Sequence, residues 1–199
     1  MNLDNLLRFA ELMHTLQSVK RATFVNGEDR KENDIEHQYQ LAILAWYIID
    51  SENLSFDKDL VIQYALIHDV VEVYAGDTYF FGDRTGKEER ERASAERLKI
   101  EFPEFKDLHV LIEKYERQED RESKFVYALD KLVPVINIYL DKGRTWKHYG
   151  VTREMLVVNK AEKIKGSEEV KAYFDEMIIR LKEDEPELFA VHVGEQIEI

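Results

Sequence analysis

The chain has 199 residues, of which 44% are hydrophobic, and this length suits one domain with a sizeable core. None of the residues is cysteine, which excludes disulfides, thiolate zinc sites and cysteine nucleophiles. The formal net charge of -13 argues against a nucleic acid polymer as a partner, because such binding depends on clustered lysine and arginine. A small phosphorylated substrate is compatible with this charge, since it needs only local cations.

The N-terminal segment has helical spacing and lacks the features of a targeting signal. Residues 2–20 place leucines on one face, which predicts an amphipathic helix. Asp4 and Arg8 interrupt any apolar run, so the segment is neither a signal peptide nor a membrane anchor. Together with the absence of cysteine, this predicts a cytoplasmic protein with no membrane partner. Residues 21–32 contain Asn26-Gly27 and many charges, and they are predicted to form a loop.

The next helix is predicted to open at Asn33 or Asp34. Asn33 and Glu36 resemble a capping box, which satisfies free amide groups at the start of a helix. From Tyr39 to Ile49 the residues are apolar almost all round, so this helix is expected to run through the centre of the molecule. His37 lies in its first turn, at the edge of the core.

The apolar run from Leu60 to Tyr74 is predicted to be one buried helix, closed by Gly76-Asp77. It carries His68, Asp69 and Glu72, and unpaired charge inside a core is unfavourable. Their spacing places these three side chains on one side of a helix, facing a common point. One interpretation is a histidine–carboxylate pair that satisfies itself, and the other is a shared divalent cation.

The rest of the chain is also helical in pattern. The aromatic loop over residues 79–86 is interpreted either as a lid or nucleoside-packing wall, or as a set of local packing anchors. No alternating strand pattern is present, so the fold class is predicted to be all-α, a single globular helical bundle. Its core is expected over about residues 34–140, and C-terminal helices within residues 152–190 are expected to cover it. Further helices are predicted over residues 87–102, 107–117, 122–140, 152–165 and 167–182.

Three apolar helices thus carry His37, His68-Asp69 and Asp130, in that order. This order resembles the metal signature of the HD-domain phosphohydrolase superfamily. Over about residues 6–140 the chain also resembles the 5′-deoxynucleotidase branch of this superfamily, which includes a bacterial enzyme and a eukaryotic HD-domain-containing family. The strings that carry it are Glu36-His37, His68-Asp69-x-x-Glu72-Val73-x-x-Gly76-Asp77 and Ala128-Leu129-Asp130.

The resemblance implies a single HD domain over residues 1–199 with one divalent metal ion. The implied ligands are His37, His68, Asp69 and Asp130. Two imidazoles and two carboxylates suit Co²⁺, Mn²⁺, Mg²⁺, Zn²⁺ or Fe²⁺ and leave positions for water and a phosphate oxygen.

Two further carboxylates are candidate catalytic residues. Glu72 is assigned as the general base, or as the group that orients a metal-activated water molecule. Its alternative role is to hold a ligand histidine in place. The resemblance implies that Asp77 contacts the substrate or donates a proton, whereas from its position after a glycine alone Asp77 is equally well a turn residue.

The cationic candidates for substrate binding are Lys20 and Arg21, at the end of the first helix. The resemblance implies that Arg21 holds the substrate. In the bacterial enzyme of the resembled branch a tryptophan, associated with selection of the deoxy sugar, follows this arginine directly. This chain has Ala22 instead, so the resemblance leaves the choice between deoxyribose and ribose open.

The predicted function is a metal-dependent phosphomonoesterase that hydrolyses (deoxy)nucleoside 5′-monophosphates to nucleoside and phosphate. A phosphodiesterase or a nucleoside polyphosphate hydrolase on the same metal site is the first alternative. A di-iron oxygenase and an inactive metal-binding regulatory module are the others; the lack of further histidines near the site disfavours the oxygenase, and Glu72 disfavours the inactive module. Members of the resembled branch often dimerise, so a homodimer is expected.

Overall fold

The computed structural model describes residues 2–77 and 85–190. Within these residues the chain is helical apart from one small hairpin, and the predicted all-α class is confirmed. The strands are β1 Lys20–Phe24 and β2 Lys31–Asn33. The helices are α1 Leu3–Ser18, α2 Asp34–Ser51, α3 Lys58–Ile67, α4 Glu72–Ala75, α5 Lys87–Glu101, α6 Lys106–Arg117, α7 Arg121–Leu140, α8 Arg144–Tyr149, α9 Arg153–Ile164, α10 Glu168–Glu183 and α11 Glu185–Leu188.

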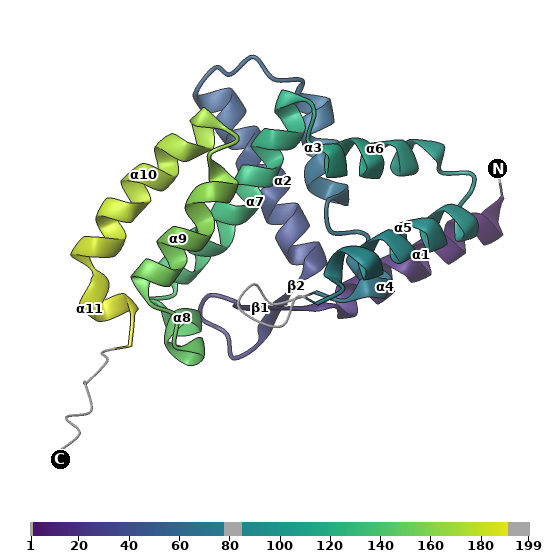
Figure 1. Cartoon of the computed structure of the whole chain (residues 1–199). Helices are drawn as coiled ribbons and strands as arrows, with labels where there is room; N and C mark the ends of the chain where they lie inside the picture. Colours follow the sequence, from purple (N-terminus) through teal and green to yellow (C-terminus); the bar gives the residue numbers. More distant parts are fainter. Residues whose placement is uncertain (1, 78–84, 191–199) are drawn as a thin grey trace.

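Helices α2, α3 and α7 form the centre of the bundle, and each packs against the other two (Figure 1). Their apolar side chains meet in one hydrophobic cluster, in which Leu41 of α2, Val61 of α3 and Phe125 of α7 are fully buried. Burying one such side chain contributes about 1.5–3 kcal/mol. Helices α9 and α10 also pack against α7 and add side chains to the same cluster, so the central helices are held in fixed positions.

A second hydrophobic cluster lies on the other side of α3. Ile67, the last residue of α3, packs against both clusters. His68 and Asp69 follow it directly, so this pair lies where the two clusters meet. The buried members of the second cluster come from α1, α5, α6 and the segment after α3, and they include Leu16, Leu98, Leu108, Val70 and Val71.

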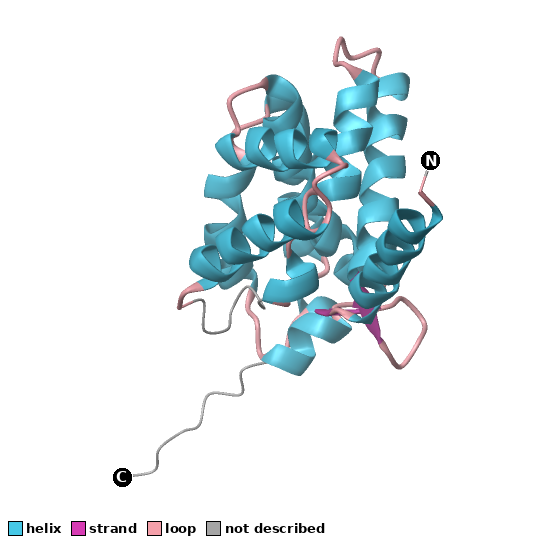
Figure 2. Ribbon diagram, turned by 90° about the vertical axis from the view of Figure 1, so that its right-hand side faces the viewer, coloured by secondary structure: helices cyan, strands magenta, loops and turns pink. Residues whose placement is uncertain are grey.

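Residues 21–32 were predicted to form a loop, and this was wrong at both ends of the segment, where β1 and β2 lie. The two strands pair in antiparallel fashion, with Lys20 opposite Asn33 and Phe24 opposite Lys31. Gly27 has φ +76°, which glycine tolerates, and it lies in the turn between the strands. Figure 2 shows the hairpin at one end of the bundle, beside the start of α2. Strands this short, with an irregular register, lack the alternation that would identify them.

The prediction of one continuous helix over residues 60–74 was also wrong. Helix α3 ends at Ile67, and the tighter three-residue spacing of hydrogen bonds replaces the helical ladder there. The amide of Glu72 donates to the carbonyl of Asp69 at 2.9 Å, and α4 begins at Glu72. Gly76 ends α4 with φ +73°, as its position predicted.

The C-terminal third contains more helix than expected. The aromatic stretch over residues 144–150 forms α8, and Gly143 precedes it with φ +73°. Residues 78–84, which include most of the aromatic loop discussed above, lie outside the described residues. Among the described residues, none of the helices is both long enough and apolar enough to cross a bilayer.

Candidate metal centre

The structure brings the four predicted metal ligands together. His37 and Asp130 face each other from α2 and α7, and His68 and Asp69 approach from the end of α3. One ligand atom from each of the four lies within 4.8 Å of the others. The side chains of both histidines and of Asp130 are at most 4% exposed, and that of Asp69 is 17% exposed.

The start of α2 is fixed by the predicted capping box. The amide of Glu36 donates to the Asn33 side chain at 3.1 Å, and the amide of Asn33 donates to the Glu36 carboxylate, also at 3.1 Å. This pair defines the first helical turn, in which His37 lies. The His37 Nε2 atom is 2.9 Å from Asp130 Oδ1.

The backbone fixes the orientation of the His68 ring. Nδ1 donates to the carbonyl oxygen of Ala65 at 2.9 Å, because a carbonyl can only accept. Nε2 therefore points towards the carboxylates, 3.0 Å from Asp69 Oδ2 and 3.6 Å from Asp130 Oδ1, and it has no partner in hydrogen-bonding geometry within the described part of the chain. A buried imidazole nitrogen turned onto carboxylate oxygens is suited to a metal ion, and the outward hydrogen bond is typical of metal-binding histidines.

The electrostatics of the cluster call for a cation. Burial opposes the protonation of His68, but the carboxylates of Asp69 and Asp130 outweigh it and raise the pKa of His68 to about 10. Burial raises the pKa of Asp69, but His68 and Arg21 outweigh it and hold that pKa well below its usual value. In the absence of a metal a proton on His68 thus supplies the positive charge. The pKa of His37, in contrast, falls to about 4 through burial and the nearby Arg21, so His37 is neutral and able to act as a ligand.

A second carboxylate group adjoins the first and shares Asp69 with it. Oxygens of Asp34, Asp69 and Glu72 lie within 4.8 Å of one another. Asp34 is fully buried, and burial and Asp69 raise its pKa to about 7. From the sequence, Asp34 was predicted only as a possible helix start. Its position three residues before His37, on the same face of α2, was the signal that it approaches the site.

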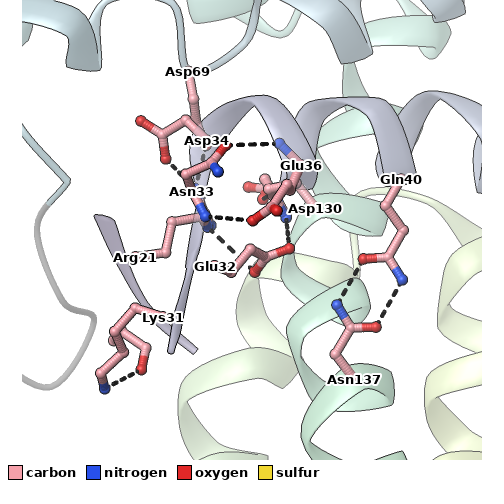
Figure 3. A network of polar contacts seen from close by, with 12 residues as sticks. Arg21, Lys31, Glu32, Asn33, Asp34, Glu36, Gln40, Asp69, Asp130 and Asn137 are labelled. Carbon is pink, nitrogen blue, oxygen red and sulfur yellow. Dashed lines mark hydrogen bonds and ion pairs between the residues drawn. The ribbon is translucent and has the colours of Figure 1, made fainter. Parts of the chain in front are cut away.

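Arg21 lies against the carboxylates (Figure 3). Its Nη1 donates to Asp69 Oδ2 at 2.6 Å and to Asp34 Oδ1 at 3.3 Å. Its Nε atom is 3.9 Å from Glu32 Oε2. The Arg21 side chain therefore balances the negative charge of Asp69, a candidate ligand, and it also lines a cavity beside the cluster. Lys20, the other predicted cation, is exposed and does not line that cavity.

A cavity of about 360 Å³ opens onto the cluster, within the range of small-molecule sites. Glu72 and Asp77, the two predicted catalytic residues, both line it. Glu72 is 2% exposed, and Lys87 Nζ lies 3.6 Å from its Oε1 atom. Burial and the neighbouring Asp69 raise the pKa of Glu72 to about 10, and burial also raises the pKa of Asp77. The cavity also has walls that were not predicted, from α8 with Trp146 and from α9.

An all-α fold with a buried histidine–aspartate cluster beside a cavity defines a helical protein with a candidate metal centre. The comparison with protein families gives the particular family: the HD-domain model matches residues 13–171, and the chain belongs to the HD-domain family.

The chain is also similar to individual proteins and solved structures. The human protein named 5′-deoxynucleotidase HDDC2 is 35% identical over 133 residues, which make up 64% of this chain and 63% of the human one. The chain thus spans less than two thirds of that relative's length. A crystal structure from Magnetospirillum magnetotacticum, described as a "predicted metal-dependent phosphohydrolase", is 31% identical with a TM-score of 0.80, over 92% of this chain and 94% of that one. A hypothetical protein from Pyrococcus furiosus shares the fold, with a TM-score of 0.62 at 22% identity over 92% of this chain and 99% of that one.

Proposed function

We propose that this protein is a metal-dependent phosphomonoesterase that hydrolyses nucleoside 5′-monophosphates, with deoxynucleotides as the first candidates. The observation that carries the proposal is the convergence of His37, His68, Asp69 and Asp130 in one cluster, three of whose members, His68, Asp69 and Asp130, line the cavity. The names of the human and Magnetospirillum relatives support the reaction class and the substrate.

The four side chains fit one divalent ion by donor type, burial and orientation. Such an ion, when bound, supplies Lewis-acid chemistry that activates water and offsets the charge of a phosphoryl oxygen. The chain itself provides the groups that hold these ligands in position. The Ala65 carbonyl holds the His68 ring in place, and Arg21 orients Asp69 through their 2.6 Å hydrogen bond.

Glu72 is proposed to take the proton of the attacking water. Its Oε2 atom is buried and has no hydrogen-bond partner among the described residues, and Lys87 approaches Oε1. The raised pKa of Glu72 describes the metal-free cluster, in which Asp69 and the other carboxylates are not neutralised by an ion. A divalent ion held beside Glu72 would lower that pKa and give the carboxylate form, whose free oxygen at the cavity wall can accept a proton. Asp77 lines the same cavity, and we propose that it contacts the substrate and donates a proton to the departing sugar oxygen.

Cations close to the cluster are proposed to orient the phosphate. Arg21 and Lys87 both line the cavity, and both are already paired with carboxylates of the site. Ala22 also lines the cavity, and we propose that its small side chain leaves room for the sugar of the substrate. This is compatible with both deoxy and ribo substrates, so both belong in any assay. The di-iron oxygenase is disfavoured, because the two ligand groups of the described residues contain no histidine besides His37 and His68.

The direct test is a phosphate-release panel of deoxy- and ribonucleoside monophosphates, with Mn²⁺, Co²⁺ and Mg²⁺. We expect Asp69→Ala to abolish both metal uptake and turnover. Glu72→Gln should keep the metal and lose at least about 100-fold in turnover, the usual scale for removing a proton-transfer group. Glu113→Gln is the matched control, since Glu113 is exposed, pairs with Lys99 and does not line the cavity, so its loss should change neither quantity.

Metal content, measured by mass spectrometry, separates the two roles considered for Glu72. Lower metal content in Glu72→Gln at unchanged turnover per bound ion would assign the residue to ligand support. Full metal content with full turnover would remove it from the reaction.

We also propose that the protein is a homodimer. Tyr39, Ile43, Trp46 and Tyr47 follow one face of α2 and are 44–66% exposed, an unusual surface for a helix at the centre of a bundle. Light scattering is expected to give a dimer mass for the wild type and a monomer mass for Trp46→Glu. Val158→Glu, at an exposed valine of α9, is the control that should stay dimeric.

Two further proposals concern the extent of the domain and the location of the protein in the cell. We propose that residues 1–199 act as one domain, because Phe174 and Leu181, beyond the matched family model, are buried in the same cluster as α2 and α7. We propose a cytoplasmic location, which the lack of cysteine supports.

A further inference from the structure

Glu32, the middle residue of β2, is a buried carboxylate beside the metal centre. It is 5% exposed, which is rare for a glutamate. The pairing of β1 with β2 makes it a neighbour of Arg21, whose Nε atom is 3.9 Å from Glu32 Oε2 (Figure 3). The other oxygen, Oε1, is 3.9 Å from Nδ1 of His37. One carboxylate therefore lies between the arginine of the site and a candidate metal ligand.

The polar atoms around this carboxylate are not fully paired. A distance of 3.9 Å is too long for a direct hydrogen bond. Arg21 Nε, Glu32 Oε2 and His37 Nδ1 are all buried, and none of these atoms has a hydrogen-bond partner in residues 2–77 and 85–190. Buried polar atoms without partners are unfavourable and uncommon in native proteins. Three of them around one carboxylate indicate an arrangement that suits another state of the site.

The second ring nitrogen of His37 shows which state that is. Nε2 is 2.9 Å from Asp130 Oδ1, in hydrogen-bonding geometry. A carboxylate can only accept, so in the metal-free cluster Nε2 carries the ring proton and donates it to Asp130. A neutral imidazole has one ring proton, and Nδ1 then presents a lone pair towards the negatively charged Glu32. This contact is electrostatically unfavourable.

Metal binding reverses the sign of that contact. A ligand nitrogen must be free of its proton, so a His37 ring that binds an ion through Nε2 carries its proton on Nδ1. The Nδ1–H group then faces Glu32, and attraction replaces repulsion. Metal-binding histidines usually donate their other N–H group to a carboxylate or a carbonyl, which fixes the tautomer and the orientation of the ring. His68 has such a partner in the Ala65 carbonyl, and Glu32 lies in the corresponding place for His37.

We propose that Glu32 is a positioning residue of the metal centre, which accepts a hydrogen bond from Nδ1 of His37 when Nε2 binds the ion. It favours the tautomer that the metal requires over the one that pairs with Asp130. A small rotation of the Glu32 side chain, or one bridging water molecule, provides the hydrogen bond across the 3.9 Å distance. This inference rests on the metal site of the proposed function, and it is tested through metal binding instead of turnover.

The first test is a titration of the full chain, freed of metal by chelation, with Co²⁺ followed by visible absorption. Burial raises the pKa of Glu32 to about 7, so the titration is run at about pH 8, where the carboxylate is ionised. Glu32→Ala is expected to lower the Co²⁺ affinity about 10- to 100-fold, the usual range for removing a group that supports a ligand. Glu28→Ala, at an exposed glutamate in the turn of the same hairpin, is the matched control and should keep the wild-type affinity. An unchanged affinity in Glu32→Ala would overturn the proposal.

A double variant separates the two neighbours of Glu32. Arg21 donates to the candidate ligand Asp69, so Glu32 has a second, indirect route to the metal. Glu32→Ala is therefore also measured in an Arg21→Met background, where that route is absent. We expect the substitution to keep most of its effect on Co²⁺ affinity there. If Glu32→Ala has no effect in this background, Glu32 acts through Arg21 and its assignment to His37 is refuted.

Nuclear magnetic resonance of the wild type with Zn²⁺ and isotope-labelled histidine tests the tautomer directly. The signals of His37 are identified by their loss in His37→Gln. We expect a ring bound through Nε2, with a strongly deshielded proton on Nδ1 that shifts in Glu32→Gln, because the amide is a weaker acceptor than the carboxylate. A ring bound through Nδ1, or an Nδ1 proton with the same shift in both proteins, would refute the role of Glu32.

These measurements are independent of the proposed activity. The expected affinities and tautomer, without phosphate release in any metal, would support the role of Glu32 and refute the phosphomonoesterase. Phosphate release by the wild type, together with unchanged Co²⁺ affinity in Glu32→Ala, would do the reverse. Thermal unfolding of each variant confirms that it is folded, and the tautomer of the wild type decides the question if a variant does not fold.

Discussion

Lys160 makes the stability of the metal-free protein depend on pH in a way that can be calculated. Burial and the nearby Lys131 lower its pKa from 10.5 to about 7. The unfolded chain therefore binds this proton more tightly than the folded chain. Between about pH 7 and pH 10.5 unfolding takes up a proton, so a rise in pH across this window stabilises the fold.

The magnitude follows from the two pKa values. Each pKa unit corresponds to about 1.4 kcal/mol, so the full effect below pH 7 is at most about 5 kcal/mol. Between pH 7 and pH 9 the wild type should gain about 2 kcal/mol from this residue. Lys160→Met lacks the ammonium group and should be more stable than the wild type at pH 7, with an advantage that shrinks by about 2 kcal/mol at pH 9.

The assay is urea unfolding of the chelated protein at several pH values. The other groups that act on Lys160 are Asp130 of α7, Lys163 of α9 and Arg21 of β1, and all of them remain in the variant. Lys165→Met reports the effect of removing an exposed lysine. A difference between wild type and Lys160→Met that stays constant from pH 7 to pH 9 would refute the reasoning, because Lys160 would then have an ordinary pKa.

Three further predictions concern the fold and the metal. Gly143→Ala should lower the free energy of unfolding by about 3 kcal/mol or more, since a Cβ atom would lie 1.8 Å from the backbone oxygen of Leu188 in α11 and φ is +73°. Gly150→Ala, with open space around it, should lose only about 1 kcal/mol in the same urea titration. Asn33→Ala should lower the free energy of unfolding by about 1 kcal/mol and also weaken metal affinity, because the cap positions the first turn of α2. Ser167→Ala, at the start of α10, should cause a similar loss of stability without any loss of metal affinity. Chelation should lower the melting temperature by about 5 to 10 °C relative to metal at 100 times its Kd, and Asp69→Ala should show no such response in differential scanning fluorimetry.

The central helices could be predicted because their residues determine them locally. α2 has a capping box and an apolar surface almost all round, and α7 has a long apolar run. His37 and Asp130 were recognisable because ionisable side chains in apolar helices need partners. Spacing along the chain carries no information about whether residues so far apart in sequence converge in the fold. The prediction that they do came from the resemblance to a family.

The hairpin could not be predicted, and Arg21 illustrates the consequence. Strands of five and three residues with an irregular register have no reliable pattern. Their pairing depends on contacts with α2, α7 and α8. The hairpin directs Arg21 onto Asp34 and Asp69, so the sequence suggested a substrate contact but not this ion pair. Lys20, its neighbour, was assigned the same role only because the direction of each side chain was unknown.

Lys160 was missed for another reason, although its signal was present. Helix α9 is rich in lysine and glutamate, which is typical of a solvated helix. The position of Lys160 midway between Leu156 and Ile164 contradicts that interpretation. A charge in register with buried residues is the same signal that identified His37 and Asp130, and it applies equally to lysine.

The break after α3 separates the ligand role from the proton-transfer role. A continuous helix would place Glu72 one turn after His68, facing the same point, and would favour it as another ligand. In the structure α3 ends before His68, and Asp69 alone is common to the two carboxylate-containing groups. Glu72 then belongs with Asp34 and not with the histidines. This arrangement supports Glu72 as a proton acceptor beside the metal ligands, because a carboxylate that is not itself a ligand keeps a free oxygen for the water.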